Sequence, residues 1–284
     1  MKHSYIDWYY FKHSARGIMV FVVFLLRLSM PGESVYAQVS GVSASKLTAI
    51  DASLVASKTL EVEPSFSYLY SKKAFDGNGD LYPVSLDNDS AVILKDMFFR
   101  FTYGVSKHLE IGTYITANLS SVSFGAKYRF VQYKKFLAVA LLGVNFSNES
   151  SFGIRKTGFF GKYIGIASGV GLTGNFTSRF SLDVSAQYQY AFCYEGFLSS
   201  GFFLDSDLGY YILDGTLQLA GGLSFQYNRF KPGKPDVYRL SFHPGVTVET
   251  GKSFILVFYT PIDLTGKNMG CFTGFSLAFT LTVH

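Results

Sequence analysis

The chain has 284 residues and a formal net charge of +5, and its Lys and Arg residues are not clustered as a nucleic-acid-binding surface requires. Aromatic residues make up 18% of the chain and charged residues only 16%, below the roughly 25% of charged residues in an average soluble domain. This composition argues against a soluble enzyme, and beyond the N-terminus no apolar run reaches the roughly 20 residues of a membrane-spanning helix.

Residues 1–37 have the parts of a secretory signal peptide. A basic region precedes the short apolar run Gly17–Leu26, and small residues end at Ala37 in an acceptable cleavage site before Gln38. The basic residues are Lys2, Lys12 and Arg16. An uncleaved membrane anchor is the alternative, but about ten apolar residues are too few to span a bilayer. We therefore expect cleavage, export from the cytoplasm and a mature chain that begins at Gln38.

From Thr59 to His284, nearly every stretch of about ten residues alternates apolar with small or polar side chains. In Phe180–Phe192 the large apolar side chains fall on one face and Ser, Asp and Gln on the other, because successive side chains of a strand point to opposite faces. One face suits lipid and the other suits water. The pattern predicts an all-β fold, a transmembrane antiparallel up-and-down β-barrel over residues 59–284, with residues 38–58 as a short periplasmic or lumenal segment.

In chain order, the alternation predicts about twelve strands. They are expected over Leu60–Ser71, Met97–Val105, Leu109–Ala117, Val122–Val131, Phe136–Phe146, Tyr163–Thr173, Phe180–Phe192, Leu204–Leu213, Thr216–Asn228, Tyr238–Val248, Phe254–Pro261 and Phe272–Val283. The faces of Phe136–Phe146 are left unassigned because its period is poor.

The connectors alternate in length, and Lys72–Lys95 and Ile262–Gly270 are expected to be long loops. Short periplasmic turns and longer extracellular loops are typical of outer-membrane barrels. An even number of strands then places both chain ends in the periplasm.

Charged and polar side chains on the predicted inner faces are the candidate site. The candidate lumen-lining residues are Arg100, Lys127, Arg129, Asp183, Asp205, Asp207, Arg239 and His243. In one interpretation they form a polar permeation path whose charges tune selectivity. In the other they pair across neighbouring strands and fill a narrow lumen. Inward glycines keep a channel open, let curved strands close, or make room for a loop folded inside.

We expect no catalytic, cofactor or metal site. His243 has Ser241 on the same predicted face, but no third group is identifiable that would orient the imidazole. Asp76–Asp80 with Asp87 has the spacing of a Ca²⁺ loop, yet Leu81 replaces the required glycine and no helices flank it. A bound cation and an ordinary Asn/Gly turn are the two interpretations.

The mature chain has two cysteines, Cys193 and Cys271, on strands that are far apart in order around the predicted barrel. A disulfide is permitted in an oxidising compartment, but the two Cα atoms would have to approach within about 7 Å. We expect free thiols.

Several stretches carry a family resemblance. Thr59-Leu-Glu-Val-Glu-Pro-Ser-Phe-Ser-Tyr68, Tyr103-Gly-Val-Ser-Lys-His-Leu-Glu-Ile-Gly112, Phe124-Gly-Ala-Lys-Tyr-Arg-Phe130 and Leu264-Thr-Gly-Lys-Asn268 followed by Gly274-Phe-Ser-Leu277 resemble the outer-membrane family of MetA-pathway transporters of phenol degradation. The resemblance implies an outer-membrane channel or transporter. The chain departs from the family in two places: residues 38–58 lack its Asp-Arg-Pro-rich start, and His284 stands where such barrels usually end in an aromatic residue.

These observations predict a channel or transporter for small molecules, hydrophobic or aromatic ones among them, in the outer membrane of a Gram-negative bacterium. The expected partners are outer-membrane lipid and lipopolysaccharide, the barrel-assembly machinery and an unidentified small solute, with no nucleic acid. The alternative is a barrel with a non-transport role, as a surface structural protein or a lipid-modifying enzyme. Ion conductance separates the two.

Overall fold

The computed structural model describes residues 39–43, 46–84, 91–147, 163–193, 198–213, 215–230, 235–250 and 253–283. The predicted signal peptide and its cleavage site lie outside these residues. No helix in the described part of the chain is long and apolar enough to cross a membrane.

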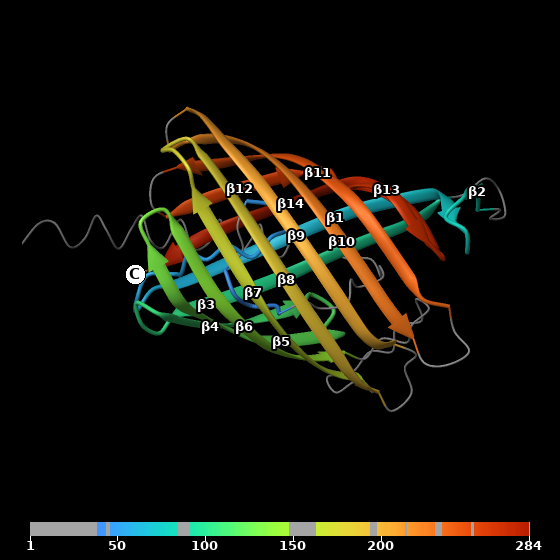
Figure 1. Cartoon of the computed structure of the whole chain (residues 1–284), viewed down its shortest axis with the longest axis horizontal. Coiled ribbons are helices and arrows are strands. Elements are labelled where there is room, and N and C mark those ends of the chain that lie inside the picture. Colours follow the sequence, from blue (N-terminus) through green and yellow to red (C-terminus); the bar gives the residue numbers. More distant parts are fainter. Residues whose placement is uncertain are drawn as a thin grey trace, which may run out of the picture.

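The described residues form one antiparallel sheet that closes on itself (Figure 1). Its strands are β1 (Leu60–Phe75), β2 (Leu81–Pro83), β3 (Val92–Gly104), β4 (Leu109–Thr116), β5 (Ser121–Tyr133), β6 (Phe136–Ser147), β7 (Tyr163–Asn175), β8 (Phe180–Cys193), β9 (Leu198–Leu213), β10 (Leu217–Phe230), β11 (Val237–Thr250), β12 (Phe254–Tyr259), β13 (Ile262–Lys267) and β14 (Met269–Val283). Each main strand pairs with its sequence neighbours, and β14 pairs with β1 to close the barrel.

The wall formed by the described residues consists of twelve strands that run from one rim to the other. β12 and β13 count as one of them, because together they fill the place between β11 and β14. β2 is not counted, because it pairs only with the end of β1. Thr260 and Pro261 separate the two halves, and proline has no N–H to give to a ladder. The predicted all-β barrel of about twelve strands is therefore confirmed.

Two predicted loops were wrong in extent. Within Lys72–Lys95, β1 continues to Phe75, β2 adds a short hairpin strand, and β3 already begins at Val92. Within Ile262–Gly270, the residues up to Lys267 form β13. Both stretches are rich in Lys, Asp, Gly and Asn, residues that are uncommon in strands, and here the ladder with neighbouring strands prevails over propensity.

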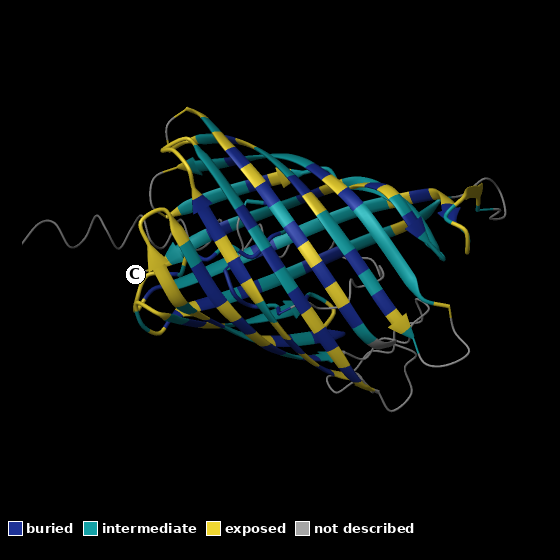
Figure 2. Cartoon of the chain, in the orientation of Figure 1, coloured by how far each residue is buried: buried dark blue, intermediate teal, exposed yellow. Residues whose placement is uncertain are grey.

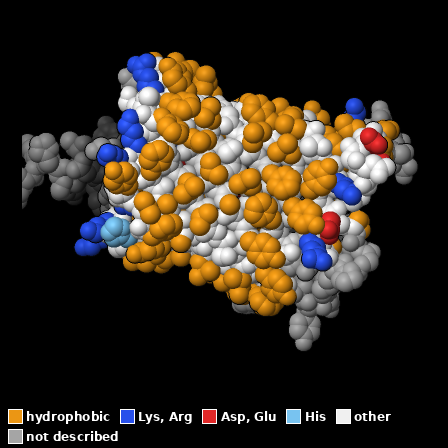
Figure 3. Space-filling model, in the orientation of Figure 1, with side chains coloured by type: hydrophobic (Ala, Val, Ile, Leu, Met, Phe, Trp, Pro, Cys, Tyr) orange, Lys and Arg blue, Asp and Glu red, His pale blue; other side chains and the backbone are white. Residues whose placement is uncertain are grey.

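The wall is apolar outside and polar inside. Along β8, Asp183, Ser185, Gln187 and Gln189 are buried, whereas Tyr188, Tyr190 and Phe192 are exposed. Buried and exposed residues alternate along the strands (Figure 2), and apolar side chains cover the outer face while charged ones gather at the two ends (Figure 3). An apolar band between two polar rims is the surface that a bilayer requires, so the barrel belongs in the bacterial outer membrane.

Strand β6 has an apolar inner face, which explains its poor period in the sequence. Val139 and Leu141 are buried on the inside, while Leu142 faces outward. The two inward side chains belong to an apolar cluster with residues that precede the barrel in the chain. The inner face of β6 is apolar because it packs against a segment inside the barrel.

Candidate functional site

The segment that precedes β1 lies inside the barrel. We call Val39–Lys58 the plug. Its described apolar side chains Val39, Val42, Ile50 and Ala52 form one buried cluster with Val139, Leu141 and Ala167 of the wall. In Figure 1 the plug is the blue trace that runs within the ring of strands. Inside the lumen its backbone groups need partners, because the wall has used its own N–H and C=O groups between strands.

The first anchor of the plug is Glu110 on β4. Its carboxylate accepts hydrogen bonds from the backbone N–H of Ser43 and the N–H of Val55, each at 2.7 Å, and from the Ser43 hydroxyl. The Lys127 ammonium on β5 lies 3.2 Å from the same carboxylate and 3.3 Å from that of Asp51 in the plug. Glu110 and Lys127 are both 0% exposed, so this is a buried charge pair completed by the plug.

The second anchor is Asp207 on β9. One of its carboxylate oxygens accepts the N–H groups of three consecutive plug residues, Leu47, Thr48 and Ala49, at 2.8–2.9 Å. Three amide donors on one oxygen stabilise the negative charge of a buried carboxylate. Nearby on β8, Asp183 pairs with Lys46 of the plug, so the plug also supplies a charge to the wall.

Glycines of the wall make room for the plug. Gly125 on β5 faces the plug so closely that an added Cβ would collide with the Ser40 carbonyl oxygen and lie 3.1 Å from a methyl of Val42. Gly104 on β3 approaches the Ala56 carbonyl in the same way. Of the roles that the sequence leaves open for inward glycines, the structure shows at these positions the accommodation of a segment inside the lumen.

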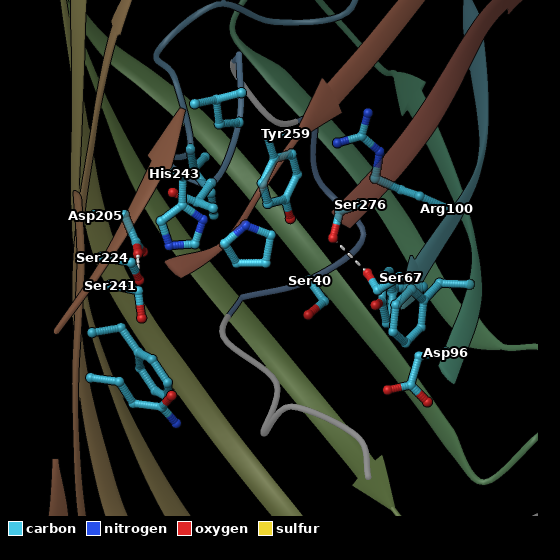
Figure 4. A pocket seen from close by; sticks show the side chains of 18 of the residues that line it. Ser40, Ser67, Asp96, Arg100, Asp205, Ser224, Ser241, His243, Tyr259 and Ser276 are labelled. Atoms are coloured by element: carbon cyan, nitrogen blue, oxygen red, sulfur yellow. Dashed lines mark hydrogen bonds between the residues drawn. The ribbon is translucent and has the colours of Figure 1, made fainter. Parts of the chain in front are cut away.

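Beside the plug lies a cavity of about 320 Å³. Strand residues that line it, such as Asp96, Thr116 and Ser121, lie toward the rim opposite the one where Leu60 pairs with Val283. We expect this rim to be the extracellular one. The plug forms one side through Val39–Val42 and residues of Leu47–Ile50. Figure 4 shows polar and aromatic side chains pointing into this space.

The candidate residues from the sequence fall into three groups. Arg100, Asp205, Arg239 and His243 line the cavity, and Lys127, Asp183 and Asp207 contact the plug. Arg129 lies apart from both: beyond it β5 has a bulge, and its guanidinium donates to the Lys107 carbonyl in the β3–β4 turn at 2.7 Å.

Glu110 and the plug are the functional features missing from that set. The alternation of β4 already points Glu110 inward. The sequence allows residues 38–58 a periplasmic or a lumenal position, and because the plug has no strand periodicity the pattern does not decide between the two.

The geometry gives no nucleophile and base pair at Ser241. Its hydroxyl donates to the Asp263 carboxylate at 2.6 Å, and the two ring nitrogens of His243 have no hydrogen-bond partner among the described residues. A serine needs a hydrogen bond to its base to act as a nucleophile.

The acidic turn after β1 is an Asx turn in the described residues. The Asp76 carboxylate accepts the N–H groups of Asn78 and Asp80, and these bonds lower its pKa. Asp87 lies outside the described residues. Cys271 is a free, half-buried thiol, and the Cys193 side chain lies outside the described part.

The fold and the lumen together define a plugged β-barrel of the outer-membrane type. No protein-family model and no curated protein matches the chain. Among solved structures, the chain is similar to an outer membrane channel from Pseudomonas putida F1, with a TM-score of 0.62 and 11% identity over 82% of this chain and 98% of that one. At this identity the likeness shows the shared fold.

Lower scores relate the chain to the toluene transporter TbuX of Ralstonia pickettii (TM-score 0.41, 10% identity, 84% of this chain and 92% of that one). The CymD monoaromatic hydrocarbon channel gives a TM-score of 0.46 and 10% identity over 80% of this chain and 89% of that one. Scores below 0.5 support no inference about solute. The resemblance to the MetA-pathway family stays a prediction.

Proposed function

We propose that the chain is an outer-membrane channel for small molecules and that its own N-terminal segment holds it closed. The observation that supports this most is the attachment of the plug. In its described part the plug joins no sheet, and it is held by hydrogen bonds to Glu110 and Asp207, by ion pairs and by one apolar cluster. A segment held in this way can leave the lumen without breaking the ladder of the wall.

The side chains that line the cavity favour a ring-shaped solute. Aromatic residues of several strands line it, among them Phe98, Tyr114, Phe203 and Tyr259. Hydrophobic or aromatic compounds, the solutes expected from the sequence, are part of this proposal. The volume of the cavity, about 320 Å³, lies at the lower end of the range for small-molecule sites.

Insertion by the barrel-assembly machinery and contact of the outer loops with lipopolysaccharide also belong to the proposal.

The competing function is a non-transport barrel, either a surface structural protein or a lipid-modifying enzyme. The hydrogen bond from Ser241 to Asp263 argues against the enzyme, because the hydroxyl is directed to Asp263 and makes no Ser–His pair with His243. A purely structural barrel would gain stability from a plug but would have no reason to conduct ions after the plug is removed.

The test is a variant that joins Gln38 directly to Thr59 and so lacks the whole plug. After heat-modifiable gel mobility has shown a folded barrel, we expect steady single-channel conductance in planar bilayers, where the full-length chain is closed with brief openings. A synthetic peptide of residues 39–58 added from the periplasmic side should restore the block, which controls for specificity. A folded variant that conducts no more than the full-length chain would favour the non-transport barrel.

A further inference from the structure

Acidic side chains outnumber basic ones on the inner face of the described wall. The basic ones are Arg100, Lys127 and Arg239. The acidic ones are Glu61, Glu63, Asp96, Glu110, Asp183, Asp205, Asp207 and Asp263. Each basic group already lies beside a wall carboxylate, at 2.5 Å for Arg100, 3.2 Å for Lys127 and 3.8 Å for Arg239. The basic charges are therefore matched within the wall, and the excess is negative.

This negative charge is concentrated on β8 and β9. The register places Asp183 directly opposite Asp207, and it places Asp205 opposite Ser185, one step further along the inner face. The three Asp residues are at most 1% exposed. Directly opposed side chains of an antiparallel pair have Cβ atoms about 4.5–5.5 Å apart, and like charges there are destabilising. The two strands therefore need groups of opposite sign beside these carboxylates.

The plug supplies groups of that sign. Lys46 places its ammonium against Asp183, and the consecutive N–H groups of Leu47–Ala49 donate to Asp207. At Glu110 the plug again contributes N–H donors. Successive backbone N–H groups carry partial positive charge and bind anions. In the closed barrel the plug thus acts as an electropositive ligand of an acidic wall.

The cavity beside the plug has an excess of the same sign. Its lining holds the carboxylates of Glu63, Asp96, Asp205 and Asp263 and the guanidiniums of Arg100 and Arg239. Figure 4 shows Asp96 and Asp205 on opposite sides of this space. The rings of Tyr114 and Tyr259 also border it, and the face of an aromatic ring attracts a cation. Both the charges and the rings of the lining therefore favour a positively charged solute.

The opening of the channel strengthens this preference. When the plug leaves the lumen, its ammonium and its N–H groups leave with it, whereas the wall carboxylates stay. The carboxylates of Glu110 and Asp207, which the plug covers in the closed barrel, then border the water-filled path. Charges of one sign along a path with low-dielectric walls focus the field and raise the local concentration of the opposite ion. Cation channels select in this way with rings of Asp and Glu.

We propose that the open channel selects cations and that its solutes are small organic cations with an apolar or ring-shaped body. The acidic side chains of the wall supply the preference for positive charge, and the aromatic rings of the cavity suit the body of the solute. Asp96, Asp183, Asp205 and Asp207 are the specificity-determining residues. The inference rests on the proposed channel function, because it names the solute class of that same lumen.

Reversal potentials of the full-length chain test the preference. In planar bilayers with a KCl gradient, we expect the openings to be about tenfold more permeable to K⁺ than to Cl⁻. Phenyltrimethylammonium in place of K⁺ should still carry current, whereas benzenesulfonate, a ring-shaped anion, in place of Cl⁻ should carry almost none. Equal permeability to K⁺ and Cl⁻, or a preference for either anion, overturns the inference.

A pair of variants tests the role of the cavity carboxylates. Asp96→Asn/Asp205→Asn removes two negative charges at nearly constant side-chain size, and it leaves two carboxylates against two guanidiniums in the lining. The preference for K⁺ should fall by about threefold. Asp76→Asn/Asp80→Asn removes the same charge from the turn after β1 and is the matched control, because this turn lies outside the lumen. Gel mobility checks the folding of both.

The outcomes separate this inference from the channel function. Equal selectivity of the folded cavity variant and the unmodified chain overturns the role of the cavity carboxylates. Conductance that does not discriminate K⁺ from Cl⁻ overturns the inference and leaves the channel in place. An absence of conductance, both in the full-length chain and in the variant without the plug, overturns the channel and the inference with it.

Discussion

Lys127 shows how a single residue links the wall to the plug. Its ammonium contacts Glu110 of the neighbouring strand, and also Asp51 and the Ser43 hydroxyl of the plug. The register pairs Lys127 directly with Glu110, so one salt bridge is a cross-strand pair and the other joins two parts of the chain. Removing one member of a buried charge pair leaves the other charge uncompensated.

We therefore expect Lys127→Met to lower the free energy of unfolding by about 3–5 kcal/mol. The double variant Lys127→Met/Glu110→Gln should lose less than the sum of the single losses, because the second change removes the unpaired charge. Urea titrations in liposomes, followed by heat-modifiable gel mobility, would measure this. Additive losses would show that the two groups do not interact.

At the residue scale, the sequence indicates the inward direction of a side chain but not its partner. Alternation along β5 points both Lys127 and Arg129 into the lumen. Lys127 meets Glu110, which the predicted pairing across strands allows, but its second partner Asp51 comes from a segment with no periodic pattern. Arg129 lies beside a bulge, which redirects the chain in a way that alternation does not reveal.

At the scale of elements, the wall has room for the plug because glycines, which carry no side chain, stand where the two come closest. Gly125 and Gly221 are both strand glycines, but they differ in what surrounds them. The three atoms nearest to an added Cβ at Gly125 all belong to the plug, the Ser40 carbonyl oxygen first, whereas at Gly221 the nearest atom is a ring carbon of Phe242 at 3.8 Å. A methyl group at Gly125 must therefore displace the plug, and one at Gly221 displaces nothing.

Gly125→Ala should weaken the closed state, and a shift of about 1.4 kcal/mol would raise the open fraction roughly tenfold. The plug should also become more accessible to proteases while the barrel stays heat-modifiable. Gly221→Ala is the matched control and should behave like the unmodified chain. Single-channel recording and limited proteolysis are the measurements, and equal behaviour of the two variants would contradict the close approach.

Most of the wall could be predicted at the element scale, because lipid outside and polar groups inside impose a period of two. The prediction was wrong at β13, and it left the faces of β6 unassigned although it placed that strand correctly. β13 contains Asp, Thr, Gly and Lys in a stretch that resembles a turn, yet it pairs with β11. β6 lost its period because the plug covers its inner face with apolar contacts.

For the whole molecule, the lipid face should show a dependence on depth. Leu142 in the middle of β6 is 58% exposed on the outer wall, and Leu213 is exposed at the end of β9. Leu142→Arg should cost about 2–4 kcal/mol of folding free energy, and Leu213→Arg only about 0–1 kcal/mol because it lies near the interface. Refolding titrations into liposomes would compare them, and equal costs would place the bilayer elsewhere.

The orientation of the whole barrel follows from its two ends. Both described ends of the wall, Leu60 and Val283, pair with each other at one rim, together with the short turn at Thr216; the turn at Asn78 lies at the opposite rim. In outer-membrane barrels the short turns lie in the periplasm, so we expect the first rim on that side. With Cys193 and Cys271 changed to Ser, we expect Asn78→Cys to react with a membrane-impermeant maleimide on intact cells. Thr216→Cys should react only after the outer membrane is permeabilised, since both positions are exposed and differ only in side. Labelling of Thr216→Cys in intact cells, with Asn78→Cys protected, would mean that the cavity opens to the periplasm and that the plug closes the barrel from outside.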